Sequence, residues 1–115
     1  MATAAQIRDR AATRLGILGE GETLPSYESA DLDNSYTEIY AQLVALSLAV
    51  WDFDDEVPDE YTPHVVSMVA YNRANDYAIP NDRYSRIAAD SQAALNIIRE
   101  LQTNDVYTQD KPDYF

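Results

Sequence analysis

The glycines of this chain form the first group of residues whose spacing could support chemistry. Gly16, Gly19 and Gly21 are its only glycines, and they lie within six positions of each other. The run differs from a phosphate-binding loop, because it follows a helical pattern instead of a strand and no Lys-Ser/Thr pair comes after it. Its acidic neighbours would also repel phosphate. The spacing therefore favours a structural turn over a nucleotide site.

An acidic segment at residues 52–56 is the second candidate. Its carboxylates belong to Asp52, Asp54, Asp55 and Glu56. A calcium-binding EF-hand loop needs glycine at its sixth position and a carboxylate at its twelfth, where this chain has Val57 and Pro63. A glycosidase would need two carboxylates held across a cleft, and neither these acids nor Glu20 with Glu22 stand out as such a pair. The pattern favours a solvated acidic loop.

His64 is the only histidine, and it follows Pro63 at the start of a helical pattern. No cysteine or serine-nucleophile motif accompanies it, so a capping or surface role is favoured over catalysis. The lack of cysteine also removes disulfides and thiolate metal sites. We expect no catalytic residue, no metal and no cofactor.

Charge is divided unevenly along the chain. No Lys or Arg occurs between Leu15 and Asn72, whereas twelve of the 20 acidic residues lie there. The remaining acids balance the eight bases, so the net charge of −12 originates in the middle half. Such a surface argues against tight DNA binding through phosphates, and it can also serve solubility alone. With no membrane-length apolar run and no secretory signal, synthesis in the cytoplasm is expected.

The periodicity of apolar residues predicts an all-α fold, a four-helix bundle with a glycine-rich corner after the first helix and an extended C-terminal arm. Thr3 and Gln6 form a capping box before the first helix, and Gly16 ends it. The expected helices cover residues 4–15, 26–51 with Ser26 as cap, 62–79 with Thr62 as cap, and 81–104 with Asn81 as cap. The bundle domain is thus residues 1–104, and the arm is 105–115.

Two features of this outline suggest surfaces for partners. The second half of the expected helix 26–51 is apolar nearly all round, which indicates either a central helix or a helix covered by another subunit. Several of the nine tyrosines follow helical stripes and suit either the core or a subunit interface. The arm carries the aromatic and β-branched anchors Val106, Tyr107, Tyr114 and Phe115. We interpret it as a docking arm and not as a disordered end.

The first 26 residues resemble the start of a known family. An amphipathic helix ends in Arg14-Leu15-Gly16-Ile17-Leu18-Gly19-Glu20-Gly21-Glu22, and Pro25-Ser26 opens a long helix. This form resembles head-to-tail adaptor proteins of short-tailed phages, also called tail accessory or head-completion proteins. The size, the helix order and the segment 71–80 are similar to that family as well.

The resemblance implies a structural virion protein at the phage neck, assembled in the host cytoplasm. Such adaptors bind the portal protein after packaging, form a ring of 12 copies and extend the channel through which duplex DNA passes. A tail or nozzle protein would bind the distal side, and the arm would reach the portal. From the residues themselves, we expect Gly16, Gly19 and Gly21 to act as a hinge between the first two helices. No membrane is implied. We further expect acids from the middle of the chain to line the channel, with Glu28, Asp31, Asp52, Asp54, Asp55 and Glu56 as candidates.

Two other classes of protein remain open from the sequence. A small cell-wall glycosidase would use a pair of the acidic residues, one of them with a raised pKa. A helical regulatory module would bind a partner as a monomer or dimer and form no ring.

Overall fold

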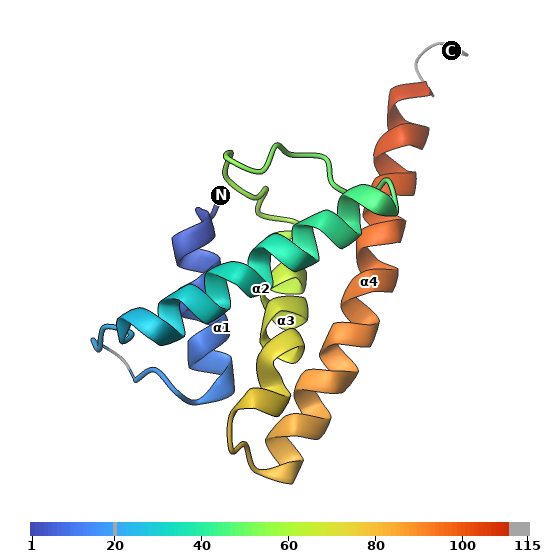
Figure 1. Cartoon of the computed structure of the whole chain (residues 1–115). Helices are drawn as coiled ribbons and strands as arrows, with labels where there is room; N and C mark the ends of the chain where they lie inside the picture. The colour runs from blue at the N-terminus through green and yellow to red at the C-terminus, as the bar shows by residue number, and fades with distance from the viewer. Residues whose placement is uncertain (20, 111–115) are drawn as a thin grey trace.

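The computed structural model describes residues 1–19 and 21–110, with only the backbone described for residues 103–110. It contains α1 (Ala4–Leu15), α2 (Ser26–Ala45), α3 (Thr62–Arg73), a 3₁₀ turn η1 (Ala74–Asp76) and α4 (Asn81–Asp110) (Figure 1). Across these residues β-pairing is limited to one antiparallel bridge between Ala2 and Val57. The prediction of an all-α, four-helix fold is confirmed.

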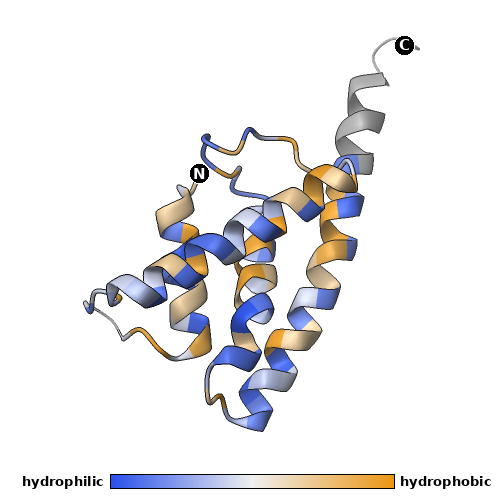
Figure 2. Ribbon diagram, in the orientation of Figure 1, coloured by the Kyte–Doolittle hydropathy of each residue, from blue (hydrophilic) through white to orange (hydrophobic). Residues whose placement is uncertain are grey.

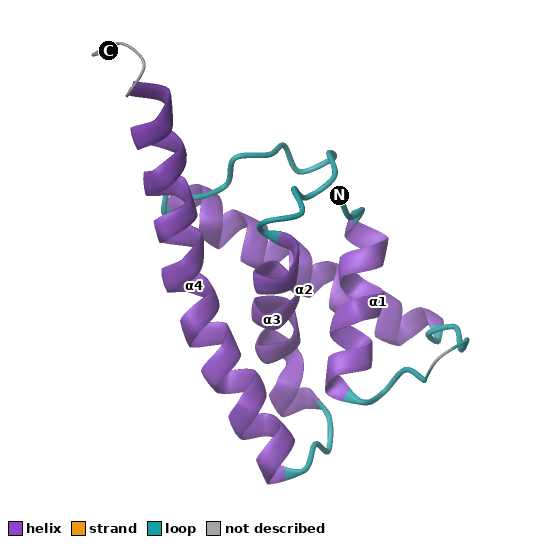
Figure 3. Ribbon diagram, turned by 180° about the vertical axis from the view of Figure 1, so that it is seen from behind, coloured by secondary structure: helices purple, strands orange, loops and turns teal. Residues whose placement is uncertain are grey.

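Helix α3 forms the centre of the bundle. It packs against α1, α2 and α4, and its tightest pairing is with α4 (Figures 1 and 3). Seven of its 12 residues are buried, on all sides of the helix: Thr62, Val65, Val66, Ser67, Met68, Val69 and Ala70. A helix that is apolar all round must be covered all round, and α3 meets that condition within one chain. Helix α2, the sequence-based candidate for a central helix, lies on the outside.

Helix α1 begins and ends as its sequence predicts. Thr3 Oγ1 accepts a hydrogen bond from Gln6 N, and the Gln6 side chain accepts one from Thr3 N, which completes the capping box. At the other end Gly16 has φ +80°. Gly16 N donates to Thr13 O and Ile17 N to Ala12 O, the pair of bonds that defines a Schellman motif.

Helix α2 ends at Ala45, about six residues before the predicted end, because the chain forms the same motif there without glycine. Ser47 N donates to Val44 O (2.9 Å) and Leu48 N to Leu43 O (2.8 Å). Ser47 adopts φ +61°, the left-handed conformation that this motif requires of the residue after the helix. Leu43 and Leu48 are both buried, which supplies the hydrophobic contact typical of the motif.

The start of α2 and α3 also differs in detail from the prediction. Ser26 is the first residue of α2, and Pro25 before it forms no side-chain cap. Thr62 belongs to α3, and its hydroxyl donates to Pro58 O instead of accepting from the helix. Both predicted caps are therefore wrong by one position, and so is Asn81, which is the first residue of α4.

Helix α4 is longer than predicted and continues through Asp110. The extended arm predicted from residue 105 is therefore wrong for residues 105–110, the positions of Val106 and Tyr107. Residues 105–110 contain no glycine or proline, and their β-branched members lower helix propensity by only about 0.7 kcal/mol each or less, so an existing helix continues through them. Tyr114 and Phe115 lie outside the described residues. The C-terminal end of α4 extends past the other three helices (Figure 1).

Ser47→Gly should stabilise the protein by about 1 kcal/mol, because glycine adopts the left-handed conformation without the steric cost that serine pays. The midpoint of urea unfolding would measure this. Ala41→Gly, at an exposed position inside α2, is the control and should destabilise by a similar amount. A neutral or destabilising Ser47→Gly would contradict the strain assigned to this turn.

Candidate functional site

An apolar patch lies at the C-terminal end of α2 and in the loop that follows. It consists of Val44, Leu46, Val50 and Phe53, whose exposed fractions are 52, 41, 46 and 42%. Figure 2 colours this end of α2 orange, in contrast to the polar first half of the helix. The sequence offered two explanations for this apolar stretch: that α2 is the central helix, or that another subunit covers it. Since α3 and not α2 is the central helix, nothing in the described part of the chain covers the patch.

Aromatic packing fixes the loop after α2 to the bundle. Trp51 Nε1 donates to Tyr36 Oη (3.1 Å), and Tyr40 Oη donates to the carbonyl oxygen of Trp51 (2.7 Å). The Phe53 ring lies 5.3 Å from that of Tyr40, and the Trp51 ring lies 5.5 Å from that of Tyr61. Burial raises the pKa of Tyr36. These contacts give the loop a defined conformation even though its charged residues face solvent.

The loop 52–60 displays its acidic side chains outward, and we call it the acidic loop. Its exposed carboxylates belong to Asp52, Asp54, Asp55, Glu56, Asp59 and Glu60. Val57 is fully buried and exchanges two backbone hydrogen bonds with Ala2 (2.8 and 3.1 Å), while Asp59 contacts the N-terminal ammonium group. Among the described residues, no three His, Cys, Asp or Glu side chains are placed to hold a metal ion together.

The six channel-lining candidates fall into two separate groups. Glu28 and Asp31 lie in the first turns of α2, whereas Asp52, Asp54, Asp55 and Glu56 lie beyond its other end. A 20-residue helix spans about 30 Å, so the two groups form no single cluster. Near the first group, burial raises the pKa of Tyr77, with a smaller contribution from the charge of Asp31.

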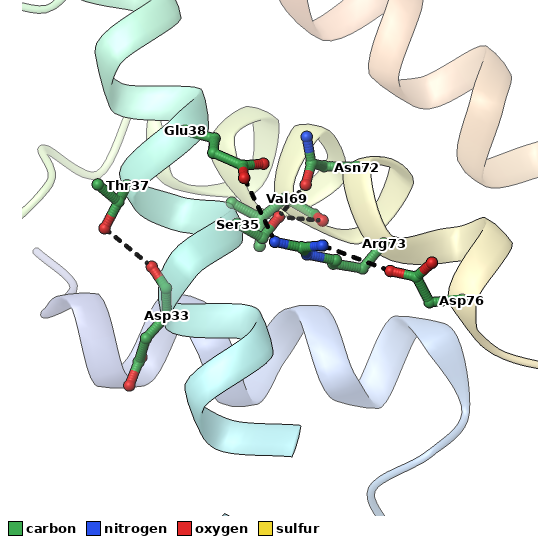
Figure 4. A network of polar contacts seen from close by, with 8 residues as sticks. All are labelled: Asp33, Ser35, Thr37, Glu38, Val69, Asn72, Arg73 and Asp76. Carbon is green, nitrogen blue, oxygen red and sulfur yellow. Dashed lines mark hydrogen bonds and ion pairs between the residues drawn. The ribbon is translucent and has the colours of Figure 1, made fainter. Parts of the chain in front are cut away.

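A polar network joins α2 to the end of α3 (Figure 4). The buried Ser35 Oγ lies 3.1 Å from Val69 O and 2.8 Å from Asn72 Oδ1. Arg73 extends between two carboxylates, with its guanidinium 3.4 Å from both Glu38 and Asp76. These groups connect two helices through hydrogen bonds and ion pairs. Because they join α2 to the end of α3 and to η1, we assign them a structural role.

A basic groove lies between the end of α1 and the start of α4, and it was not predicted from the sequence. It encloses about 340 Å³ and is lined by Thr13, Arg14, Arg83, Arg86, Ile87 and Asp90. A second hollow of about 280 Å³ shares Arg14 and Asp90 with it and adds Pro63, His64, Ser67, Ala93 and Ile97. Burial in this region lowers the pKa of His64. A sequence signal existed in Arg83 and Arg86, which are one helical turn apart, but Arg14 comes from a distant part of the chain.

Gly16, in the glycine corner, lies against Arg83 of this groove. Gly16 and Gly21 have φ +80° and +78°, whereas Gly19 forms a turn in which Glu22 N donates to Gly19 O (3.1 Å). A Cβ atom on Gly16 would collide with the guanidinium of Arg83, which covers this position. Gly16 therefore meets two requirements, a left-handed backbone and close approach of an arginine.

A third groove, of about 440 Å³, opens between α2, α3 and α4. None of its lining residues is charged; they are Ile39, Gln42, Met68, Tyr71, Asn72, Asn75, Ser91, Gln92 and Leu95. A glycosidase cleft needs two opposed carboxylates, which this groove does not contain.

Comparison with known proteins gives no match. No protein-family model, no curated protein and no solved structure matches this chain. No helix in the described ranges is both long and apolar enough to cross a membrane.

Tyr40→Phe should destabilise the protein by about 1 kcal/mol, because it removes the hydroxyl that holds the Trp51 carbonyl. Trp51 is the only tryptophan, so its fluorescence reports the loop directly during urea unfolding. Tyr27→Phe, at a residue 69% exposed, is the matched control and should change stability by less than about 0.5 kcal/mol. Equal effects of the two substitutions would contradict the anchoring role of Tyr40.

Proposed function

We propose that this protein is a head-to-tail adaptor of a tailed phage, a structural protein that forms a ring on the portal after DNA packaging. The observation that carries the proposal is the uncovered apolar patch. Val44, Leu46, Val50 and Phe53 lie within ten positions of one another in the sequence and are all more than two-fifths exposed. Several exposed apolar side chains at the end of one helix and in the loop after it indicate contact with another protein.

A ring requires two different faces on each subunit, because neighbours must meet head to tail. The patch and the acidic loop provide one face at the C-terminal end of α2, and the side of the bundle formed by α1 and α4 provides another. The sequence resemblance supports the class of protein independently of these surfaces, through the run Arg14 to Glu22 and the Pro25-Ser26 start of α2.

The C-terminal end of α4 suits the role of a portal-binding arm. It extends beyond the bundle, where it is accessible to a partner (Figure 1). In this proposal Val106 and Tyr107 belong to the last turns of α4, and Tyr114 and Phe115 follow it in the sequence. A helix ordered before binding loses less conformational entropy on docking than an extended chain would.

The excess of acidic residues supports passage of DNA without adhesion. Duplex DNA carries one negative charge per about 1.7 Å, so a channel wall rich in carboxylates would repel it. Of the six channel-lining candidates, Glu28 and Asp31 lie in the first half of α2, away from the acidic loop. In this proposal they face the channel. A tail or nozzle protein would bind the ring on the side opposite the portal.

The two alternative classes have less support from the geometry. The uncharged groove offers no carboxylate pair to a glycosidase. A monomeric regulatory module would leave the apolar patch exposed to solvent, while a dimeric one could cover it. A dimeric regulatory module would form no ring, so ring formation distinguishes the adaptor from it.

Electron microscopy of this protein mixed with the portal-like product of a neighbouring gene should reveal a ring on the portal. Deletion of residues 105–115 should remove portal binding, since these residues form the end of the projecting helix and the sequence beyond it. Intact folding of the deleted protein would be checked by circular dichroism. A protein that stays monomeric or dimeric beside an assembled portal would overturn the proposal.

Leu46→Asp should prevent ring formation while leaving the fold intact, because the side chain is exposed in the single chain. A charge at the centre of a buried interface typically weakens it by a factor of about 30 or more. Ala30→Asp, at an exposed position in the first half of α2, is the control and should assemble normally. Native mass spectrometry would count the copies per ring. Rings formed equally well by both variants would contradict a role for the patch.

A further inference from the structure

The acidic loop and the basic groove have complementary charge and lie on different elements of the same chain. We infer that the acidic loop of one copy docks in the basic groove of the next copy. This inference rests on the proposed ring, and it names the two surfaces that meet. It also commits the loop to a protein partner of defined chemistry, a second copy of this chain.

On the loop side, carboxylates alternate with apolar side chains. Asp52 and Asp54 flank Phe53, which is 42% exposed, and Val50 precedes them at 46% exposure. The aromatic contacts of Phe53 and Trp51 hold this segment in place before any partner arrives. A loop that is already ordered loses little entropy on binding, so its contacts translate more fully into affinity.

On the groove side, three of the eight basic residues of the chain lie together. Arg14 pairs with Asp90, and Arg86 lies 4.0 Å from Asp82, so two carboxylates partly neutralise the site. One positive charge remains in excess, in a chain whose net charge is −12. Arginine is suited to this contact, since its planar guanidinium binds carboxylates with two hydrogen bonds.

The groove also offers apolar surface for Phe53. Pro63, Ala93 and Ile97 line the hollow that adjoins the arginines, with Arg14 shared between the two. An aromatic ring on these side chains would place a flanking aspartate near Arg14, which lines both the hollow and the basic groove. Tryptophan, tyrosine and arginine are enriched at the hot spots of protein–protein interfaces.

Charge favours a second copy over nucleic acid as the occupant. A phosphate backbone entering the groove would approach a molecule with a large negative net charge. Contact between two identical acidic loops would place like charges together, which disfavours a two-fold symmetric dimer through this loop. The inference therefore assigns Asp52 and Asp54 to the subunit contact and leaves Glu28 and Asp31 for the channel.

Charge reversal tests the contact. Asp52→Lys with Asp54→Lys should weaken self-association by about 100-fold, and so should Arg83→Glu with Arg86→Glu. All four substitutions in one chain should restore rings, because complementarity is regained with the signs exchanged. Ala30→Lys with Asn34→Lys and Glu100→Lys changes the net charge as much as the loop variant, at exposed positions outside both surfaces, and should assemble like the unmodified protein.

Cross-linking tests the geometry, and the absence of native cysteine makes it specific. Asp54→Cys and Arg83→Cys proteins, mixed and treated with a short bis-maleimide, should form covalent dimers on the assembled portal. Ala30→Cys mixed with Arg83→Cys should not. Dimers from Asp54→Cys alone would overturn the inference in favour of a symmetric contact, and rings from both charge-reversed variants would overturn it while leaving the adaptor proposal intact. Unmodified protein that forms no ring on the portal would instead refute the adaptor proposal.

Discussion

The burial of α3 on three sides is the constraint on which the rest of this structure depends. Val65, Val69 and Ala70 are fully buried in a helix of only 12 residues, and α1, α2 and α4 all pack against it. Burial of apolar side chains contributes about 25 cal/mol per Å², so a short helix enclosed by three others supplies much of the core. Because all three helices converge on α3, hollows remain at its flanks beside α4, and two of the grooves described above lie there.

The two Schellman motifs explain why one helix end was predictable and the other was not. Both have the same hydrogen bonds, from Gly16 and Ile17 in α1 and from Ser47 and Leu48 in α2. In a sequence, glycine after a helical pattern indicates a residue in the left-handed conformation. Serine in that conformation has a steric cost that tertiary contacts must offset. At α2 the burial of Leu48 and Trp51 supplies those contacts. Local patterns thus predicted the helices and the α1 end, while the α2 end depended on residues that meet only after folding.

The same limit applies to the surfaces. The acidic middle of the chain was visible in its sequence, because charge along a segment needs no folding to be counted. The basic groove required α1 and α4 to meet, and their arginines are separated by about 70 residues, as Arg14 and Arg83 illustrate. The periodicity of apolar residues also did not indicate which of the apolar helices would lie at the centre of the bundle. Helices α2 and α3 both contain long apolar stretches, but only α3 packs closely against all three of the other helices.

An acidic loop held firmly against an aromatic core is difficult to explain by solubility alone. Carboxylates needed only for solubility function equally well on a mobile segment, and ordering a backbone residue costs about 1–2 kcal/mol. Here Tyr36, Tyr40 and Trp51 hold the segment through ring contacts and two hydrogen bonds. A fixed loop conformation is useful when the carboxylates must occupy defined positions, as they must in a contact with an oppositely charged surface. The basic groove is such a surface, and because it lies elsewhere on the same chain, the contact leads to head-to-tail assembly and not to a closed pair.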